Sequence, residues 1–263
     1  MLFRSPFVAS LDHLGPFARS SRDLAVAYDV LQGPDAHDPA CTSRAIEPCA
    51  PAIAKGTVGL RIAVAGGYFS ERAGEDALEA VRIAASALRV DREVTLPETA
   101  RARAAAYLIT ASEGANLHLP NLRTRAGDFE PLSRDRFLAG ALIPAAWYLQ
   151  AQRFRRWYAR EVAALFKTVD AIIAPATPLT ATPIGAETAP FGNITLPVRP
   201  NMGIYTQPIS FIGLPVAAVP IHREGRMPIG IQVIAAPWRE DICLRVSAAL
   251  EQAGVARAPV VTP

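Results

Sequence analysis

"DAIIAPA", at residues 170–176, is a short apolar run that leads into a stretch rich in Pro and Thr, and it has the composition of a buried β-strand. A second run of this kind, "LRIAVAGG" at residues 60–67, is followed by the helical pattern "GEDALEAVRIAASALR" and then by "EVTLP" at residues 93–97. This order predicts a strand–helix–strand unit. Strands that alternate with helices in this way predict an α/β fold.

A hairpin pattern follows later in the chain. "PVAAVPI" and "MPIGIQVIA" are strand-like runs, and "HREGR" at residues 222–226 joins them. Gly225 within this connection suits a turn, so the two runs are predicted to pair. Residues 177–200, in contrast, are rich in Pro and Thr, and their composition predicts a loop.

Four further segments carry helical patterns. In residues 20–32, Ser20 occupies the N-cap position, where its hydroxyl can accept a backbone N–H, and Asp23 lies near the positive end of the helix. Residues 98–119 form an Ala-rich pattern that runs into the polar stretch "SEGANLHLPNLRTR", which we interpret as the C-terminal end of a surface helix. The other patterns cover residues 135–167, with a break at Pro144, and residues 239–254.

Composition excludes several classes of protein. A chain of 263 residues with a net charge of +3 can bury most of its apolar surface in one large or two small domains. No run approaches the ~20 apolar residues of a membrane span, and the first ten residues do not form a secretory signal. Three cysteines without CxxC spacing (Cys41, Cys49 and Cys243) predict free thiols and no metal site. We expect a cytoplasmic protein without a cofactor and without a membrane partner.

The segment "AQRFRRWYAR" at residues 151–160 mixes basic and aromatic residues, a combination that is also found in nucleic-acid-binding proteins. On a helix, however, its aromatic side chains fall on one face and Arg153, Arg156 and Arg160 fall on another. This arrangement is typical of a core-facing stripe beside a solvated face. We therefore expect no nucleic-acid partner.

Four stretches resemble the amidase-signature hydrolases, and they stand in the order in which that family has them. They are "SLDHLGPFARSSRDLAVAYDVLQGPDAHDP", "DAIIAPATPLTATPIG", "YTQPISFIGLPVAAVP" and "MPIGIQVIAAPWRED". The resemblance covers essentially the whole chain and departs at Ala235-Ala236, where the family usually has a glycine nearby. It implies the amidase-signature fold, an α/β fold in which helices flank a mixed sheet. Residues 1–263 would be the C-terminal part of a single amidase domain.

The resemblance also implies a Ser–Ser–Lys triad that cleaves C–N amide bonds, with its serines in a Gly-rich G-G-S-S-G-G motif. This sequence has no such motif. Ser20-Ser21 lacks flanking glycines and lies at a predicted helix cap, and the two lysines, Lys55 and Lys167, do not match the family's lysine. Because a serine hydroxyl is a poor nucleophile without a base, we expect the N-terminal catalytic half to be absent and the chain alone to be inactive.

Two more stretches, "ITASEGANLHLPNLRTRAGDFEPLSRDRF" and "AAWYLQAQRFRRWY", look like the subgroup of the family that acts on small carboxylated ureas of the 1-carboxybiuret type. A carboxylated substrate calls for an arginine, which can bind a carboxylate bidentately. Arg123 and Arg136 resemble substrate-binding arginines of related amidases, although Pro120 stands where relatives often have a tyrosine. We also expect Arg136 to open a helix. The alternative for each arginine is a surface ion pair with Asp128, Glu130 or Asp135.

Two other classes of function remain open at this point. The chain could be a non-catalytic interaction module, or one chain of a split amidase or of an enzyme related to the amidotransferases. Beside a small-molecule amide substrate, the resemblance implies a small accessory subunit or a homo-oligomer. In the chain alone we expect the apolar faces of residues 60–67 and 170–176 to be uncovered.

Overall fold

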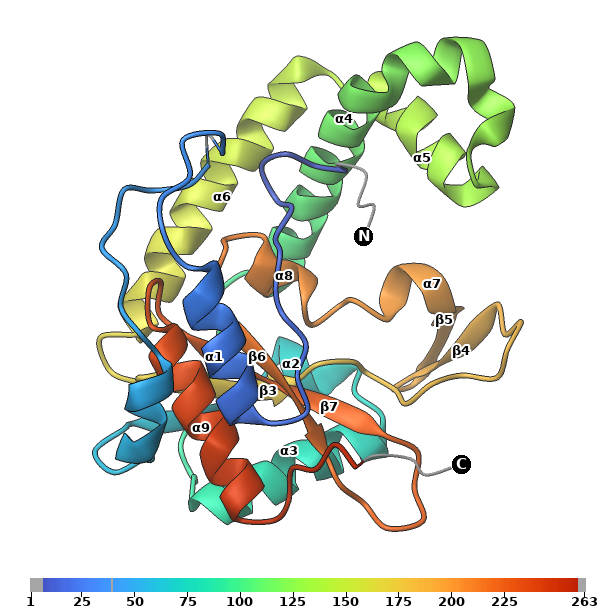
Figure 1. Cartoon of the computed structure of the whole chain (residues 1–263). Coiled ribbons are helices and arrows are strands. Elements are labelled where there is room, and N and C mark those ends of the chain that lie inside the picture. The colour runs from blue at the N-terminus through green and yellow to red at the C-terminus, as the bar shows by residue number, and fades with distance from the viewer. Residues whose placement is uncertain (1–6, 39, 260–263) are drawn as a thin grey trace. The chain divides into compact units, whose positions relative to one another are not determined.

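The computed structural model describes residues 7–38 and 40–259, and within this part the chain forms two compact units. Unit 1 takes the described residues up to Leu14 together with Pro97–Ala163 and Thr206–Gly213. Unit 2 takes Gly15–Leu96, Ala164–Tyr205 and the described residues from Leu214 onward. Figure 1 labels most of the helices and strands of both units.

Unit 2 contains a five-stranded mixed sheet in the order β2-β1-β3-β7-β6. β1 runs parallel to β2 and to β3, whereas β7 runs antiparallel to β3 and to β6. The strands are β1 (Ile62–Ala65), β2 (Glu93–Val94), β3 (Ala171–Pro175), β6 (Val216–Ile221) and β7 (Ile229–Ala235). The α/β class, the strand–helix–strand unit and the hairpin around Gly225 are thereby confirmed, and Gly225 has the positive φ of 66° that its turn needs.

β3 is the central strand of this sheet, and all five of its residues are buried. The expectation that residues 170–176 would be uncovered is therefore wrong. Hydrogen-bonded neighbours on both edges, together with the helices, enclose the strand within unit 2 itself. In β1, burial alternates along the strand, so only part of that run is enclosed.

Helices α3 (Glu75–Leu88) and α9 (Glu240–Gln252) contact the same three strands and also contact each other, so they lie side by side on one face of the sheet. Helix α1 (Ser21–Leu31) packs on α9, as Figure 1 shows. The predicted cap is present, because the Ser20 hydroxyl accepts a hydrogen bond from the backbone of Asp23 at 3.0 Å. The short helical turns of unit 2 are η1 (Ala50–Lys55), α2 (Tyr68–Glu71) and α7 (Val198–Asn201).

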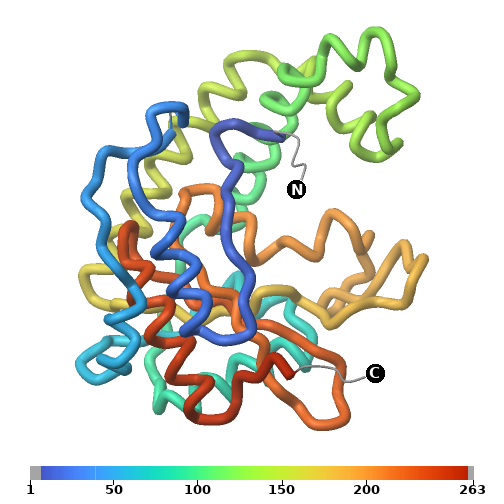
Figure 2. The backbone as a smooth tube through the Cα atoms, in the orientation of Figure 1, coloured from blue at the N-terminus to red at the C-terminus, as the bar shows by residue number. Residues whose placement is uncertain are grey.

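The predicted loop at residues 177–200 is not all irregular. It contains the antiparallel pair β4 (Thr188–Phe191) and β5 (Ile194–Pro197), joined by Gly192 and Asn193. Gly192 has a positive φ of 59°, as a two-residue hairpin turn requires. The irregular path of the remaining loop can be followed in Figure 2.

Unit 1 is helical. Its elements are α4 (Thr99–Arg125), η2 (Ala126–Asp128), α5 (Pro131–Ala141), most of α6 (Ala145–Leu165) and α8 (Gln207–Ser210). The break at Pro144 is confirmed. The predicted end of the Ala-rich helix at residue 119 is wrong, because α4 continues through Pro120 for five more residues to Arg125. In α6 the predicted division into faces is confirmed, since Tyr158 is buried whereas Arg153, Arg156 and Arg160 are exposed.

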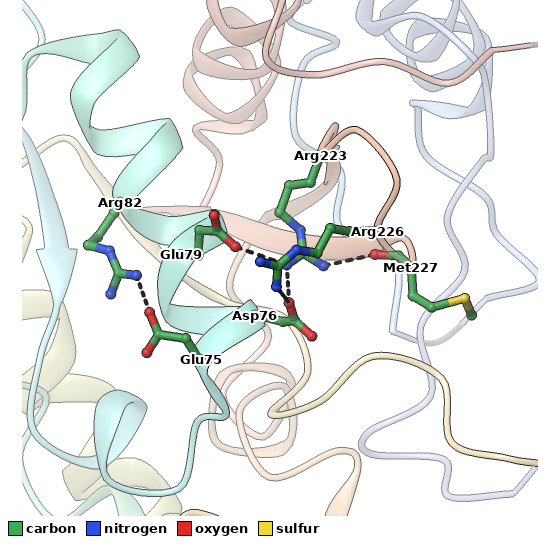
Figure 3. A network of polar contacts seen from close by, with 7 residues as sticks. All are labelled: Glu75, Asp76, Glu79, Arg82, Arg223, Arg226 and Met227. Carbon is green, nitrogen blue, oxygen red and sulfur yellow. Dashed lines mark hydrogen bonds and ion pairs between the residues drawn. The ribbon is translucent and has the colours of Figure 1, made fainter.

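The turn of the β6–β7 hairpin is held to α3 by a network of ion pairs (Figure 3). Arg223 is at its centre, with a side chain that is only 4% exposed. It pairs with Asp76 and, at 3.2 Å, with Glu79, and it donates to the carbonyl of Met227 at 2.8 Å. Arg226 is 58% exposed and reaches Asp76 at 3.2 Å. The network thus ties the hairpin to a helix that lies far from it in the sequence.

Arg223→Ala is expected to lower the free energy of unfolding by about 2 kcal/mol, because it leaves two carboxylates without a buried partner. Arg226→Ala, in the same turn, should cost less than about 0.5 kcal/mol, since its pair is exposed. Urea titration of both variants measures the difference, and equal losses would show that the network does not act through Arg223.

The same network should make stability depend on pH. Hydrogen bonds from Arg223 hold the pKa of Asp76 below its usual value. A lowered carboxyl pKa stabilises the fold above the pKa of the unfolded chain, about 4, and this contribution is lost as pH falls through the lower pKa of the folded state. Asp76→Asn should therefore have a lower free energy of unfolding than the wild type at pH 7, and this difference should become smaller at pH ~3. Urea titrations of both proteins at pH 7 and pH ~3 measure this difference. A difference that does not change with pH would contradict the stabilising role of the Asp76–Arg223 pair.

Candidate functional site

The segment predicted to bind substrate folds into two closely packed helices of unit 1, α4 and α5. Gly140 of α5 lies so close to α4 that an added Cβ would stand 2.1 Å from the carbonyl oxygen of Ala111. At Gly114 of α4, an added Cβ would stand 2.6 Å from the ring of Phe137. Glycine at both positions lets the two backbones approach, and this close packing fixes the place of the α5 side chains relative to α4.

Arg136 projects from α5 against the aromatic side of this helix pair. Its guanidinium carbon lies 4.2 Å from the ring centroid of Tyr107 and 5.7 Å from that of Phe7. The side chain is half-buried. Stacking over an aromatic face is favourable for a guanidinium, and it leaves the donors directed along the edge of the group. The surroundings of Arg136 are therefore suited to orienting a cation toward an anionic ligand.

The expectation that Arg136 opens a helix is wrong. Helix α5 begins at Pro131, and Glu130 caps it by accepting from the backbone N–H groups of Leu132 (3.2 Å) and Ser133 (2.9 Å). Arg136 stands in the second turn, away from the N-terminal end of the helix. The free backbone N–H groups of the first turn therefore do not add to the attraction of an anion at Arg136.

Arg123 stands in the last turn of α4, and its side chain is exposed. With the residues that the structure describes, Arg123 makes no hydrogen bond, ion pair or ring contact. Two of the acids considered for it pair with other arginines, Asp128 with Arg125 at 3.8 Å and Asp135 with Arg134 at 3.1 Å. No described contact joins Arg123 to Arg136, so the helix pair does not bring the two predicted residues together in one clamp.

A cavity of about 650 Å³, which the sequence did not predict, lies in unit 1 beside the α4–α5 crossing. Most of its wall is apolar, and its polar side chains are Ser10, Ser112, Glu113, Asn116 and Tyr148. The hydroxyl of Ser112 is buried and has no hydrogen-bond partner among the described residues. The signal that could have indicated this cavity is the polar run that interrupts the apolar pattern from Ser112 onward.

Glu113 organises the polar end of this cavity. It accepts from the backbone of Ser10 at 3.1 Å, from the Ser10 hydroxyl at 2.6 Å and from the Tyr148 hydroxyl at 2.9 Å. Gln152 donates to the same tyrosine oxygen at 3.0 Å. Burial, followed by the hydrogen bond to Glu113, raises the pKa of Tyr148 above its usual value. The tyrosine is thus held protonated as a donor, and the network is structural rather than a source of protons.

The candidate nucleophiles and bases of the chain do not meet. Ser20 caps α1, and the hydroxyl of Ser21, 3% exposed, donates to Glu251 at 2.7 Å. Lys55 and Lys167 are both exposed, and neither forms a hydrogen bond with a described serine. A buried serine whose hydroxyl donates a hydrogen bond to a carboxylate in a helix–helix contact is not placed to attack a carbonyl. Among the described residues, no serine and lysine are therefore assembled into a catalytic pair.

Cys41, Cys49 and Cys243 are free thiols, as expected, and burial raises the pKa of Cys49 to about 12. Within the described ranges no three His, Cys, Asp or Glu side chains are grouped so that they could hold a metal ion. A membrane-spanning helix is likewise not found there, because none of the described helices is both long and apolar enough.

Similarity to known proteins agrees with the fold. The chain is 52% identical over 255 residues to the AtzE polypeptide of 1-carboxybiuret hydrolase from Pseudomonas sp. (strain ADP), covering 96% of this chain and 56% of the relative. It is 32% identical to a polypeptide of the glutamyl-tRNA(Gln) amidotransferase of Roseiflexus sp. (strain RS-1), covering 94% and 55%. The chain thus spans about half the length of the curated relatives it matches.

A solved structure, described as a vestigial protein complex that reveals the evolutionary origins of an s-triazine catabolic enzyme, matches with a TM-score of 0.95 at 51% identity. That match covers 97% of this chain and 56% of the solved one. The mixed sheet flanked by helices is accordingly the amidase-signature fold. The amidase family model matches residues 3–244. Because this match extends over most of the sequence, the chain belongs to the amidase family.

Proposed function

We propose that this chain is the C-terminal part of a single amidase domain that hydrolyses a C–N bond of a small carboxylated urea or biuret, of the 1-carboxybiuret type. The observation that carries the proposal is the 52% identity to a polypeptide of 1-carboxybiuret hydrolase over 96% of the chain. An interaction module without catalysis would not need to keep such similarity along its whole length, and that alternative is not favoured.

In this function, Arg136 binds the substrate carboxylate and Tyr107 holds the guanidinium in place. The support is the 4.2 Å stacking distance and the half-buried position of Arg136. Arg123, exposed at the end of α4, contributes at most a longer-range attraction. The Ser–Ser–Lys triad is supplied by polypeptide outside these 263 residues, so the chain alone is inactive.

We further propose a cytoplasmic enzyme that works with a small accessory subunit or as a homo-oligomer. The solved relative is described as a protein complex, which supports a protein partner. The relatives are nearly twice as long as this chain, which supports a catalytic part that lies outside it.

The experiment that tests the hydrolase is complementation. The part of the Pseudomonas relative that this chain does not match is joined ahead of the chain, and release of ammonia is followed with a carboxylated biuret and with uncharged biuret. The chimera is expected to turn over both and to prefer the carboxylated one in kcat/KM. Turnover without that preference would support amide hydrolysis but contradict the proposed carboxylated substrate. If a folded chimera shows no turnover, both proposals are contradicted.

A further inference from the structure

Unit 1 contains a second cavity, of about 500 Å³, along the exposed side of α6. Arg153, Arg155 and Arg156 line it together with Gln152, and no carboxylate is among the described residues of its wall. The whole helix carries four arginines and a single acid, Glu161. A cavity with three guanidinium groups and no acid has a positive potential that attracts anions.

Arg155 is the fixed part of this cavity. Its Nε donates to the carbonyl of Phe211 at 2.7 Å and its Nη2 donates to the carbonyl of Ser10 at 2.8 Å, while the guanidinium lies 5.8 Å from the Phe211 ring centroid. Burial lowers the pKa of Arg155, and the nearby carboxylate of Glu113 is already bonded to Ser10 and Tyr148. A half-buried cation is thus held by neutral acceptors and faces the cavity without a carboxylate at ion-pair distance in the described part of the chain.

Arg153 and Arg156 differ from Arg155 because both are exposed and neither is bonded to a described residue. Their donors are available in the fork geometry that binds carboxylates bidentately. Leu149, which is 55% exposed, and Ile212 supply apolar wall beside the arginines. Basic and apolar groups together in one groove fit a peptide that alternates acidic and apolar side chains, and arginine is a favoured anchor at protein interfaces.

Nucleic acid, the other common polyanion, fits less well. Single strands bind along an extended basic track with aromatic rings free to stack on bases. Here three aromatic rings of α6 pack on one another, Phe154 against Trp157 at 5.3 Å and against Tyr158 at 6.1 Å. The exposed Trp147 of the same helix is not among the residues that line the cavity. The cavity also extends along only about three turns of one helix, from Leu149 to Ala159.

We propose that this cavity binds the carboxylate side chains of an acidic segment of a partner polypeptide. The proposal rests on the protein partner proposed above. Its test measures peptide binding without an amide substrate. A failure to bind the peptide can therefore be distinguished from a failure to hydrolyse amides.

The test measures binding of a short fluorescent peptide, with glutamate and leucine in alternation, to the whole chain fused to maltose-binding protein. Reversing both free arginines, Arg153→Glu with Arg156→Glu, is expected to weaken binding at least ~10-fold. Arg160→Glu is the matched control, because Arg160 is an exposed arginine of the same helix outside the cavity wall, and it should change binding less than ~3-fold in physiological salt. Circular dichroism melts check that the variants remain folded, and the neutral pair Arg153→Gln with Arg156→Gln should give an intermediate loss.

Three outcomes would overturn the proposal. The first is an equal loss in the double variant and in Arg160→Glu, which would indicate a general effect of net charge. The second is equal binding of a peptide with glutamine in place of glutamate. The third is displacement of the peptide by a single-stranded RNA of the same charge, with RNA binding that requires Arg153 and Arg156. This result would indicate that the cavity binds nucleic acid.

Discussion

Purified on its own, the 263-residue chain is expected to release no ammonia from biuret-type or simple aryl amides. Relative to the complemented chimera, kcat should fall by on the order of 10⁶-fold, the loss typical when a serine hydrolase lacks its nucleophile and base. The structure supports this expectation, because the Ser21 hydroxyl donates a hydrogen bond to Glu251 and Ser20 serves as a helix cap. No serine of the described residues is bonded to a lysine.

Ser20→Ala and Ser21→Ala are the controls for this result. In the chimera both should leave the chemistry intact, and Ser20→Ala should cost about 1 kcal/mol of stability through the lost cap. Ammonia release by the isolated wild-type chain that disappears in either variant would show a nucleophile within these residues. Release that persists in both variants would point to a contaminating amidase, which a mock purification identifies.

The parts of the fold that were predictable from sequence are those whose signals are local. The apolar runs at β1, β3, β6 and β7 are each bounded by Gly, Pro or charged residues, so their identity as strands could be inferred. The cap at Ser20 and the turn at Gly225 follow from the chemistry of single residues. The order of the strands in the sheet is set by contacts between distant segments, and no local pattern reports it.

The errors have identifiable physical causes. The polar stretch from Ser112 onward suggested a helix end, yet α4 continues through Pro120 to Arg125. Most of the residues around Pro120 are exposed, so water can satisfy the carbonyl that proline leaves without an N–H partner. The β4–β5 hairpin had a usable signal in Gly192-Asn193, which the surrounding Pro and Thr residues obscured. At α5, Glu130-Pro131 is a helix start that the pattern at Asp135 concealed.

For the site, the sequence indicated which arginines to consider but not how they differ. Both Arg123 and Arg136 lie in stretches with a helical pattern, and both resemble substrate-binding arginines of related amidases. Their environments diverge through contacts with Tyr107 and Phe7, which lie far away in the chain. Only the packing of α4 on α5 separates a half-buried, ring-supported cation from an exposed one.

The different environments of Arg136 and Arg123 lead to the second large effect, a change in kcat/KM of the complemented chimera. Arg136→Gln is expected to lower kcat/KM for the carboxylated substrate at least ~30-fold, because removing one partner of a buried charge pair costs ~2–5 kcal/mol. Uncharged biuret never uses the cation and should lose less than ~3-fold. Arg123→Gln is the matched control, an arginine of the adjacent helix that is exposed and should change either value less than ~3-fold.

The aromatic support can be tested in the same assay. Tyr107→Phe keeps the ring and should retain most of the preference for the carboxylated substrate, whereas Tyr107→Leu removes the stacking and should lose ~3–10-fold of it, mainly in KM, because a cation–π contact contributes ~0.5–2 kcal/mol. A large loss in Arg123→Gln with none in Arg136→Gln would transfer the anchor to the end of α4. If neither arginine variant changes the acid-to-amide preference by more than twofold, the carboxylate is bound elsewhere, and the stacked position of Arg136 serves only the packing of α5 on α4.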